Sequence, residues 1–152
     1  MIDCKVRIHT SDKAGIMGVM PIKGHENDAG LDLASPESVW IDPNDSDIID
    51  TLVSVEIPEG YAGIIIPRSS KNVIEAMSCT GLIDSEYNGT IKVRVYNDSP
   101  ISMKIDKWER FCQLVIFEVP KVRLVLDHVM SNEKRGSDGY GSTDRRAPYS
   151  RA

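Results

Sequence analysis

The clearest structural pattern in the chain is a run near its middle, Thr90-Ile91-Lys92-Val93-Arg94-Val95-Tyr96. Apolar and polar side chains alternate along it, so that Ile91, Val93 and Val95 lie on one face of an extended backbone. The run therefore predicts a strand with one face in a core and the other in solvent.

Short apolar segments of similar kind recur along most of the chain, separated by turn residues. We predict further strands over Cys4–His9, Ser38–Ile41, Ile48–Ile57, Tyr61–Pro67, Ile101–Ile105, Phe111–Val119 and Val122–His128. One short helix is expected around Asn72–Met77. Many short strands at roughly even spacing are typical of an all-β barrel or jelly roll. The apolar pattern stops after Met130, so we expect a β-barrel domain over 1–130 and a flexible C-terminal arm over 131–152.

Composition indicates one ordinary globular domain and argues against several classes of protein. A net charge of −5 without any basic run disfavours nucleic acid or an anionic membrane as a partner. No apolar stretch approaches the ~20 residues that span a bilayer, and the N-terminus lacks the apolar block of a signal peptide. The three cysteines are far apart, and the histidines lack zinc-site spacing. We therefore expect reduced thiols and a cytoplasmic location, or the host-cell cytoplasm if the protein is viral.

Two polar segments combine chemistry that suits a phosphate group. In Asp28-Ala29-Gly30-Leu31-Asp32-Leu33, Asp32 could hold a hydrated Mg²⁺ against phosphates, since Mg²⁺ binds carboxylates, waters and substrate oxygens. In Ile66-Pro67-Arg68-Ser69-Ser70, a buried strand ends in an arginine and two hydroxyls that can donate to an anion. Taken alone, the same residues fit a solvated Asp at a turn and an ordinary polar loop.

Two further segments place polar residues among apolar ones. Residues Gly81–Gly89 have the pattern of a hairpin, and Asp84 beside Leu82 and Ile83 suits a general base, because partial burial raises a carboxylate pKa. An Asp that only opens a turn is the alternative. Gln113 is a single amide in an apolar run, where it can point into a site or satisfy local backbone.

The C-terminal arm contains a glycine-rich segment, Arg135-Gly136-Ser137-Asp138-Gly139-Tyr140-Gly141-Ser142-Thr143. Glycine backbone can approach a ligand closely and turn its N–H groups toward an anion. Arg135 adds a cationic fork suited to phosphate, and the ring of Tyr140 could stack on a flat base. A frayed tail is the alternative interpretation.

In their order and spacing, these segments resemble the five motifs of the trimeric dUTPase family (dUTP diphosphatases): DAGLDLAS, PRSS, GLIDSEYNG, ERFCQLVIF and RGSDGYGSTD. The resemblance spans residues 21 to 143. It implies a β jelly roll that assembles as a homotrimer, with active sites at subunit interfaces and the arm closing over a neighbour's site. It also implies Mg²⁺-dependent hydrolysis of dUTP to dUMP and pyrophosphate, which lowers dUTP and supplies dUMP for thymidylate synthesis.

The same resemblance implies a role for individual residues. Asp84 would activate the water that attacks the α-phosphorus, and Asp32 would tie the hydrated Mg²⁺ into the site. Tyr87 would pack on the deoxyribose and exclude a 2′-hydroxyl. The remaining implied substrate contacts are Arg68, Ser69, Ser70, Gln113 and Arg135 at the phosphates, Ser78, Leu82, Ile83, Lys92 and Tyr140 at the uracil, and Gly139 and Gly141, which allow close approach to the substrate.

The chain departs from the family pattern at a few positions, and two other functions stay open. Ser78 stands where the family usually has Asn, and Asp138 and Asp144 replace glycines. A catalytically weak binding or regulatory trimer of the same fold is one alternative, and Asp138 is its main support. The related dCTP deaminases are the other, but their acid/base Glu is replaced here by Arg94, which cannot act as that base.

Overall fold

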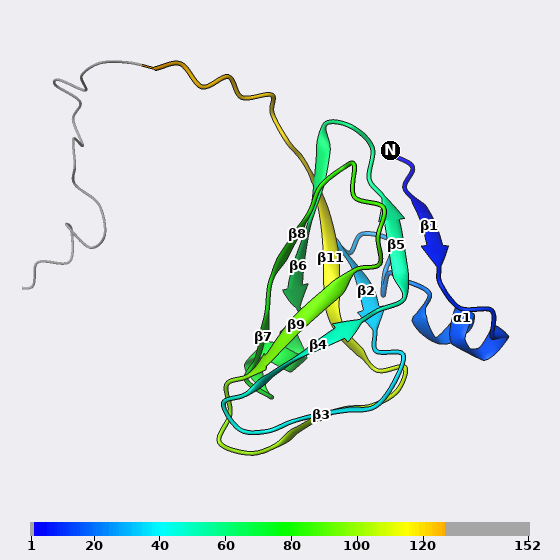
Figure 1. Ribbon diagram of the computed structural model, residues 1–152, viewed down its shortest axis with the longest axis vertical. Helices are drawn as coiled ribbons and strands as arrows, with labels where there is room; N and C mark the ends of the chain where they lie inside the picture. The colour runs from blue at the N-terminus through cyan, green and yellow to red at the C-terminus, as the bar shows by residue number, and fades with distance from the viewer. Residues whose placement is uncertain (1, 127–152) are drawn as a thin grey trace, which may run out of the picture. The chain divides into compact units, whose positions relative to one another are not determined.

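The computed structural model describes residues 2–126, and they form the predicted all-β fold together with two short helices (Figure 1). None of the helices within this range is long and apolar enough to cross a membrane. The elements are β1 (Lys5–Ile8), α1 (Lys13–Val19), β2 (Gly30–Ala34), β3 (Val39–Ile41), β4 (Ser46–Asp50), β5 (Val53–Glu56), β6 (Tyr61–Pro67), α2 (Ser69–Val73), β7 (Met77–Cys79), β8 (Gly81–Ile83), β9 (Lys92–Asn97), β10 (Met103–Ile105) and β11 (Arg110–Glu118).

The strands pair antiparallel in four sheets. The largest has the order β2-β11-β6-β8, the second has the order β4-β9-β7, and β1-β5 and β3-β10 form two-stranded pairs. Strand β11 lies between β2 and β6, where Gln113 is opposite Asp32 on one side and Ile66 on the other. This register brings three segments that are far apart in the sequence to one place.

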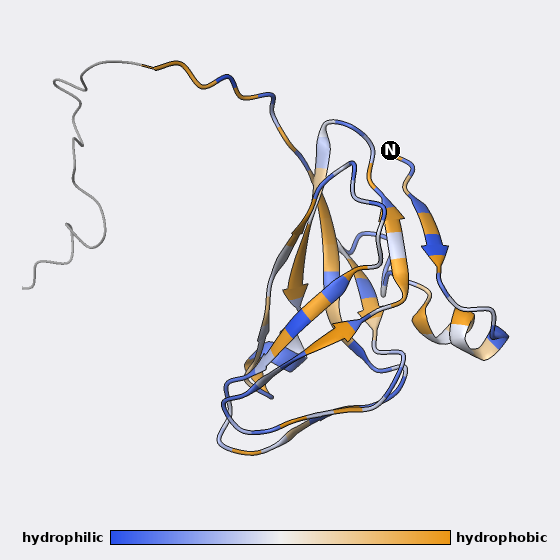
Figure 2. Cartoon of the chain, in the orientation of Figure 1, coloured by the Kyte–Doolittle hydropathy of each residue, from blue (hydrophilic) through white to orange (hydrophobic). Residues whose placement is uncertain are grey.

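Alternation along β9 agrees with the sequence pattern. Ile91, Val93 and Val95 are buried, whereas Lys92 and Arg94 are exposed. Figure 2 shows the same change between apolar and polar residues along the strand. Because successive side chains of a strand point to opposite faces, the local pattern is enough to orient this strand.

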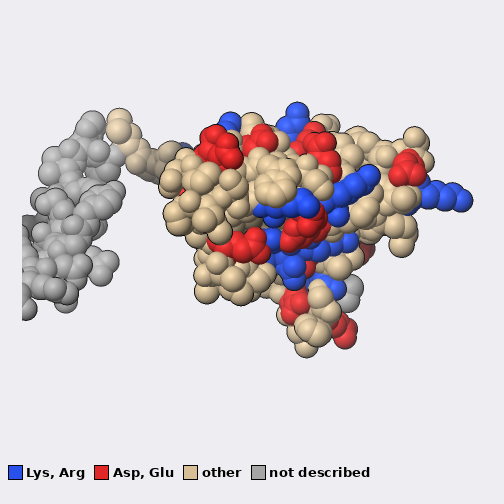
Figure 3. Space-filling view, turned by 90° about the horizontal axis from the view of Figure 1, so that it is seen from below, with Lys and Arg blue, Asp and Glu red and all other residues tan. Residues whose placement is uncertain are grey.

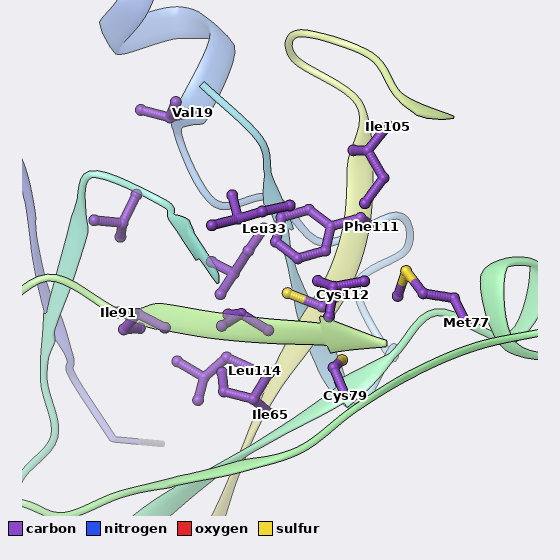
Figure 4. Packing of buried hydrophobic residues seen from close by; sticks show 14 of the residues in the cluster. Val19, Leu33, Ile65, Met77, Cys79, Ile91, Ile105, Phe111, Cys112 and Leu114 are labelled. Carbon is purple, nitrogen blue, oxygen red and sulfur yellow. The ribbon is translucent and has the colours of Figure 1, made fainter. Parts of the chain in front are cut away.

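The core lies between the four-stranded and the three-stranded sheets. Leu33, Ile65 and Leu114 come from the first sheet and pack in one cluster with Cys79 of the second (Figure 4). Phe111 is the largest fully buried side chain. Burial of each such side chain contributes about 1.5–3 kcal/mol, so the core fixes how the two sheets face each other.

Most predicted strands differ from the observed ones by one or two residues at an end, and two predicted elements differ by more. The single strand predicted over Ile48–Ile57 is divided into β4 and β5, because Leu52 has a φ of 58° and interrupts the extended backbone. The predicted helix begins at Ser69 rather than Asn72. Helix α1 was not expected; its N-terminus is capped by Asp12, whose carboxylate accepts from the Gly15 N–H at 2.9 Å.

The strand predicted over Val122–His128 is wrong for its described part. Residues 122–126 have no regular secondary structure, and their apolar side chains are largely exposed. These residues belong to a unit separate from the one that ends at Lys121. An apolar segment forms a strand only where another strand supplies the ladder hydrogen bonds, and no strand within residues 2–126 pairs with this one.

Candidate active site

Two of the predicted phosphate-binding residues, Arg68 and Gln113, lie with the predicted metal residue Asp32 near the end of β6. The Arg68 guanidinium is 3.0 Å from Asp32 through Nε and Oδ2, and its Nη1 donates to the Arg110 carbonyl at 3.3 Å. The Gln113 amide donates to the Pro67 carbonyl at 3.4 Å. We call Asp32, Arg68, Arg110 and Gln113 the Arg68 cluster. It combines fixed cationic and amide donors with one carboxylate, which suits a phosphate chain with a bound metal.

Gly30 is required for the position of Gln113. It is opposite Val115 on β11, and a Cβ at position 30 would overlap Gln113 Oε1 and lie 2.9 Å from Cδ. Real Cβ atoms essentially never come so close to another heavy atom. The glycine two residues before Asp32 therefore makes room for the amide that faces the site.

Arg110 is a candidate site residue that the sequence reasoning did not single out. Its Nη1 donates to the Met20 carbonyl at 2.7 Å and to the Asp32 carbonyl at 3.3 Å. Burial lowers the pKa of Arg110; the nearby Asp32 carboxylate raises it, and Arg68 lowers it again. The guanidinium stays charged, since its ordinary pKa is far above neutrality. The signal that could have identified Arg110 was its position in the same sequence motif as Gln113.

The two hydroxyl residues after Arg68 begin helix α2, and both are exposed. Lys71 of the same helix is buried and forms ion pairs with Glu109 and, at 2.8 Å, with Glu75. Burial lowers the pKa of Lys71, but the hydrogen bonds and charges of Glu109 and Glu75 outweigh burial and leave the pKa raised. This buried ammonium ties α2 to the loop before β11, and so holds Ser69 and Ser70 beside the Arg68 cluster. The end of the sheet at which β6 ends, seen from below in Figure 3, carries interleaved basic and acidic side chains.

Asp84 and its neighbours lie at the opposite end of β6. Asp84 directly follows β8, which pairs with Gly63–Ile65 of β6, and its side chain is exposed. A pocket of about 390 Å³ beside it is lined by residues that include Glu59, Tyr61, Leu82, Asp84 and Phe117. The Tyr87 N–H donates to the Asp84 carbonyl at 3.1 Å, so a tight turn holds both residues.

The predicted hairpin is open rather than paired. Strand β8 pairs with β6, and β9 pairs with β4 and β7, but within the described residues β8 and β9 do not pair with each other. Strand β8, with Leu82 and Ile83, therefore lies at a free edge of the four-stranded sheet. Unpaired backbone donors and acceptors at such an edge can bind the edge of a planar base. Lys92, at the start of β9, is exposed and lies 3.8 Å from Asp50.

Within one chain, the two groups of site residues are far apart. Ile83, just before Asp84, is opposite Gly63, whereas Arg68 follows Pro67 at the other end of β6. At about 3.3 Å a residue, this separates Asp84 from the Arg68 cluster by roughly 20 Å along the strand. A single chain consequently does not bring the predicted general base to the predicted phosphate site.

Comparison with known proteins identifies the family. The dUTPase family model matches residues 17–144. The chain belongs to the dUTPase family. The deoxyuridine 5′-triphosphate nucleotidohydrolase of Corynebacterium diphtheriae is 38% identical over 128 residues, which cover 82% of this chain and 84% of that protein.

Solved structures of the family have the same fold. The dUTPase of Staphylococcus bacteriophage 80alpha with dUpNHpp superposes with a TM-score of 0.81 and 28% identity, covering 93% of this chain and 98% of that one. A variant dUTPase of phage phi11 of S. aureus superposes with a TM-score of 0.76 and 24% identity, covering 86% and 100%. That phi11 protein coordinates a structural Mg(II) ion.

Ser78 and the arm residues complete the set of predicted site residues. Ser78 on β7 donates through Oγ to Asp98 Oδ2 at 2.6 Å, so its hydroxyl hydrogen is already engaged. In place of the usual family Asn, it keeps only its lone pairs for a base. The arm residues Arg135, Gly139, Tyr140 and Gly141 lie outside the described residues, as do Asp138 and Asp144.

Proposed function

We propose that this chain hydrolyses dUTP to dUMP and pyrophosphate by attack of water on the α-phosphorus. The observation that carries the proposal is the placement of phosphate-binding groups at one end of β6 and of Asp84 with an open backbone edge at the other. One end suits a triphosphate and the other suits a base and its attacking water. Family membership supports the same reaction.

In the proposed hydrolysis, different residues bind the substrate, orient the water and accept its proton. A water oxygen forms a bond to the α-phosphorus while the bond from that phosphorus to the bridging oxygen breaks, and pyrophosphate leaves. Asp84 orients the water and accepts its proton. Arg68, Gln113, Ser69 and Ser70 donate to phosphate oxygens, so that positioning and charge neutralisation supply most of the catalysis. Leu82, Ile83 and Lys92 contact the uracil through backbone, with Ser78 beside them, and Tyr87 excludes a 2′-hydroxyl.

A hydrated Mg²⁺ fits the chemistry of the Arg68 cluster. Arg68 engages only Oδ2 of Asp32, and Oδ1 has no hydrogen-bond or ion-pair partner within residues 2–126. The described residues contain no group of three metal-binding side chains, so an all-protein metal cage is not available there. Mg²⁺ characteristically keeps several waters and binds through one or two carboxylates plus substrate phosphates. We propose that Asp32 holds it through water, where it neutralises phosphate charge.

We propose a homotrimer with sites completed by neighbouring subunits. The separation of roughly 20 Å between Asp84 and the Arg68 cluster supports a site built from more than one copy. The exposed apolar residues of 122–126 support it as well, since such a segment needs a cover. Multi-angle light scattering should give three times the chain mass. A monomer that stays active at low concentration would contradict this assembly.

The C-terminal arm is proposed to close over the site. We assign a catalytic domain to 1–130 and the arm to 131–152, with Arg135 at the γ-phosphate, Tyr140 over the uracil and Gly139 and Gly141 allowing close approach. Deletion after Lys134 should leave a folded assembly with a large loss of activity. A deletion that unfolds the protein would instead show that the arm is structural. We also propose a cytoplasmic location, because the three cysteines are free and two of them are buried.

Product analysis tests the activity directly. The full chain with dUTP and Mg²⁺ should release one pyrophosphate for each dUMP, measured by chromatography and a colourimetric pyrophosphate assay. Binding of dUTP without pyrophosphate release would favour a silent regulatory trimer. Deamination of dCTP, followed by absorbance, would favour the deaminase alternative. Arg94 opposes the latter, since it is exposed and donates to Ser46 Oγ at 3.1 Å.

A further inference from the structure

The ring of Tyr87 is held by the backbone of the residues that follow it. Its hydroxyl donates to the Thr90 carbonyl at 2.8 Å. The ring lies over Gly89, where an added Cβ would be 2.7 Å from the Tyr87 hydroxyl oxygen and 2.9 Å from Cζ. The position of the ring therefore depends on where the Gly89–Thr90 backbone lies.

Thr90 is fixed through its side chain. It precedes β9, so it lies outside the sheet pairing of that strand. Its Oγ1 donates to Asp50 Oδ2 at 3.0 Å, across 40 residues of sequence. The other carboxylate oxygen of Asp50 accepts from the Leu52 N–H at 2.9 Å, and Lys92 Nζ is 3.8 Å from Oδ2. Asp50 thus joins the end of β4 to the residue that carries the Tyr87 contact.

Asp50 is itself held in place by the backbone around it. Leu52 adopts a left-handed conformation with a φ of 58°, which a leucine rarely adopts without support. The adjacent Thr51 donates through its N–H and its Oγ1 to the Ile91 carbonyl, at 3.0 and 2.9 Å. Two neighbouring segments, 50–52 and 90–91, are therefore tied together by several hydrogen bonds, and Asp50–Thr90 is the bond nearest Tyr87.

We propose that Asp50 and Thr90 are positioning residues that set the discrimination between deoxyribose and ribose nucleotides through Tyr87. The inference rests on the proposed function, in which Tyr87 excludes the 2′-hydroxyl. Exclusion by contact works only if the blocking ring cannot withdraw, because a shift of about 1 Å relieves the overlap with one oxygen atom. The Asp50–Thr90 hydrogen bond restrains that shift without touching the substrate.

The test replaces the hydroxyl while keeping the shape of the side chain. Thr90→Val removes the hydrogen bond to Asp50, and Thr90→Ser retains it as the matched control. We expect Thr90→Val to lower the ratio of kcat/KM for dUTP to kcat/KM for UTP at least tenfold, mainly through a gain with UTP. The kcat for dUTP should stay within threefold, and Thr90→Ser should stay within twofold of the unmutated ratio. Asp50→Ala should give the same change as Thr90→Val, and the double variant should add little to either.

Calorimetric binding of dUMP and UMP gives a second readout that needs no turnover. Thr90→Val should lower the preference for dUMP over UMP by a similar factor. An unchanged preference, or an equal loss for both nucleotides, would overturn the positioning role. Absence of dUTP hydrolysis by the unmutated protein would instead count against the proposed function, while the binding ratio would still decide the role of Asp50 and Thr90. Thermal unfolding of each variant identifies one that has merely lost its fold.

Discussion

Replacing Gly30 by Ala should impair catalysis by displacing Gln113 while leaving the fold intact. Gly30 lies in β2 without a positive φ, so alanine suits its backbone and slightly stabilises the chain by restricting the unfolded state. The new Cβ would overlap Gln113 Oε1 and lie 2.9 Å from Cδ, where ordinary contact begins at 3.4 Å. Cδ must therefore withdraw by 0.5 Å, the difference of these distances, and Oε1 by more. A hydrogen bond to a phosphate then stretches beyond useful length.

The size of the effect follows from the lost hydrogen bond. A hydrogen bond to a charged group contributes about 1.5–3 kcal/mol, which corresponds to a loss in kcat/KM for dUTP of about 10- to 150-fold. A contact made equally to bound substrate and transition state raises KM more than it lowers kcat. Pyrophosphate release over a range of dUTP concentrations measures both parameters.

A double-variant cycle isolates the cause. In a Gln113→Ala background the amide is already absent, so Gly30→Ala should lower kcat/KM for dUTP by no more than a further twofold. The reasoning is refuted if kcat/KM of the Gly30→Ala variant for dUTP stays within twofold of that of the unmutated enzyme. It is equally refuted if the loss is the same in both backgrounds, since the added methyl group would then act on something other than Gln113.

Three further outcomes are expected. Asp84→Asn should lower kcat by more than tenfold and still bind dUTP, measured by calorimetry; retention of a tenth of the activity would show that Asp84 is not the base. Lys71→Met should destabilise the protein by about 1–2 kcal/mol, less than for a fully buried pair because its carboxylate partners are partly exposed. The pKa of Lys71 is raised in the folded state, so its stabilising effect is present below the ordinary pKa of 10.5 and is lost as the pH rises through the folded value. Denaturant unfolding should therefore show a smaller difference in the free energy of unfolding between Lys71→Met and the unmutated protein above pH 11 than at pH 8. Finally, burial raises the pKa of Cys79 to about 11 and that of Cys112 well above its ordinary value, so at pH 8 a thiol reagent should label Cys4 first and the other two only on unfolding.

The sequence alone determined the features that depend on neighbouring residues. Alternation over Ile91, Val93 and Val95 predicted which face of β9 is buried, because the two-residue period is a property of any extended backbone. The motifs around Asp32 and Asp84 predicted the dUTPase family, which the comparisons confirm. Both are local patterns that can be interpreted without knowing which residues pack against them.

Only the tertiary structure decided which distant segments meet. It brought Arg110 to the Asp32 carbonyl, left β8 unpaired with β9, and placed Asp84 at the far end of β6 from Arg68. Residues 122–126 are also rich in apolar residues, yet they form no strand. The physical reason is that a strand needs a partner, and neither the partner nor its register is encoded in the segment itself. Both come from hydrogen bonds and packing between residues that are far apart in the sequence.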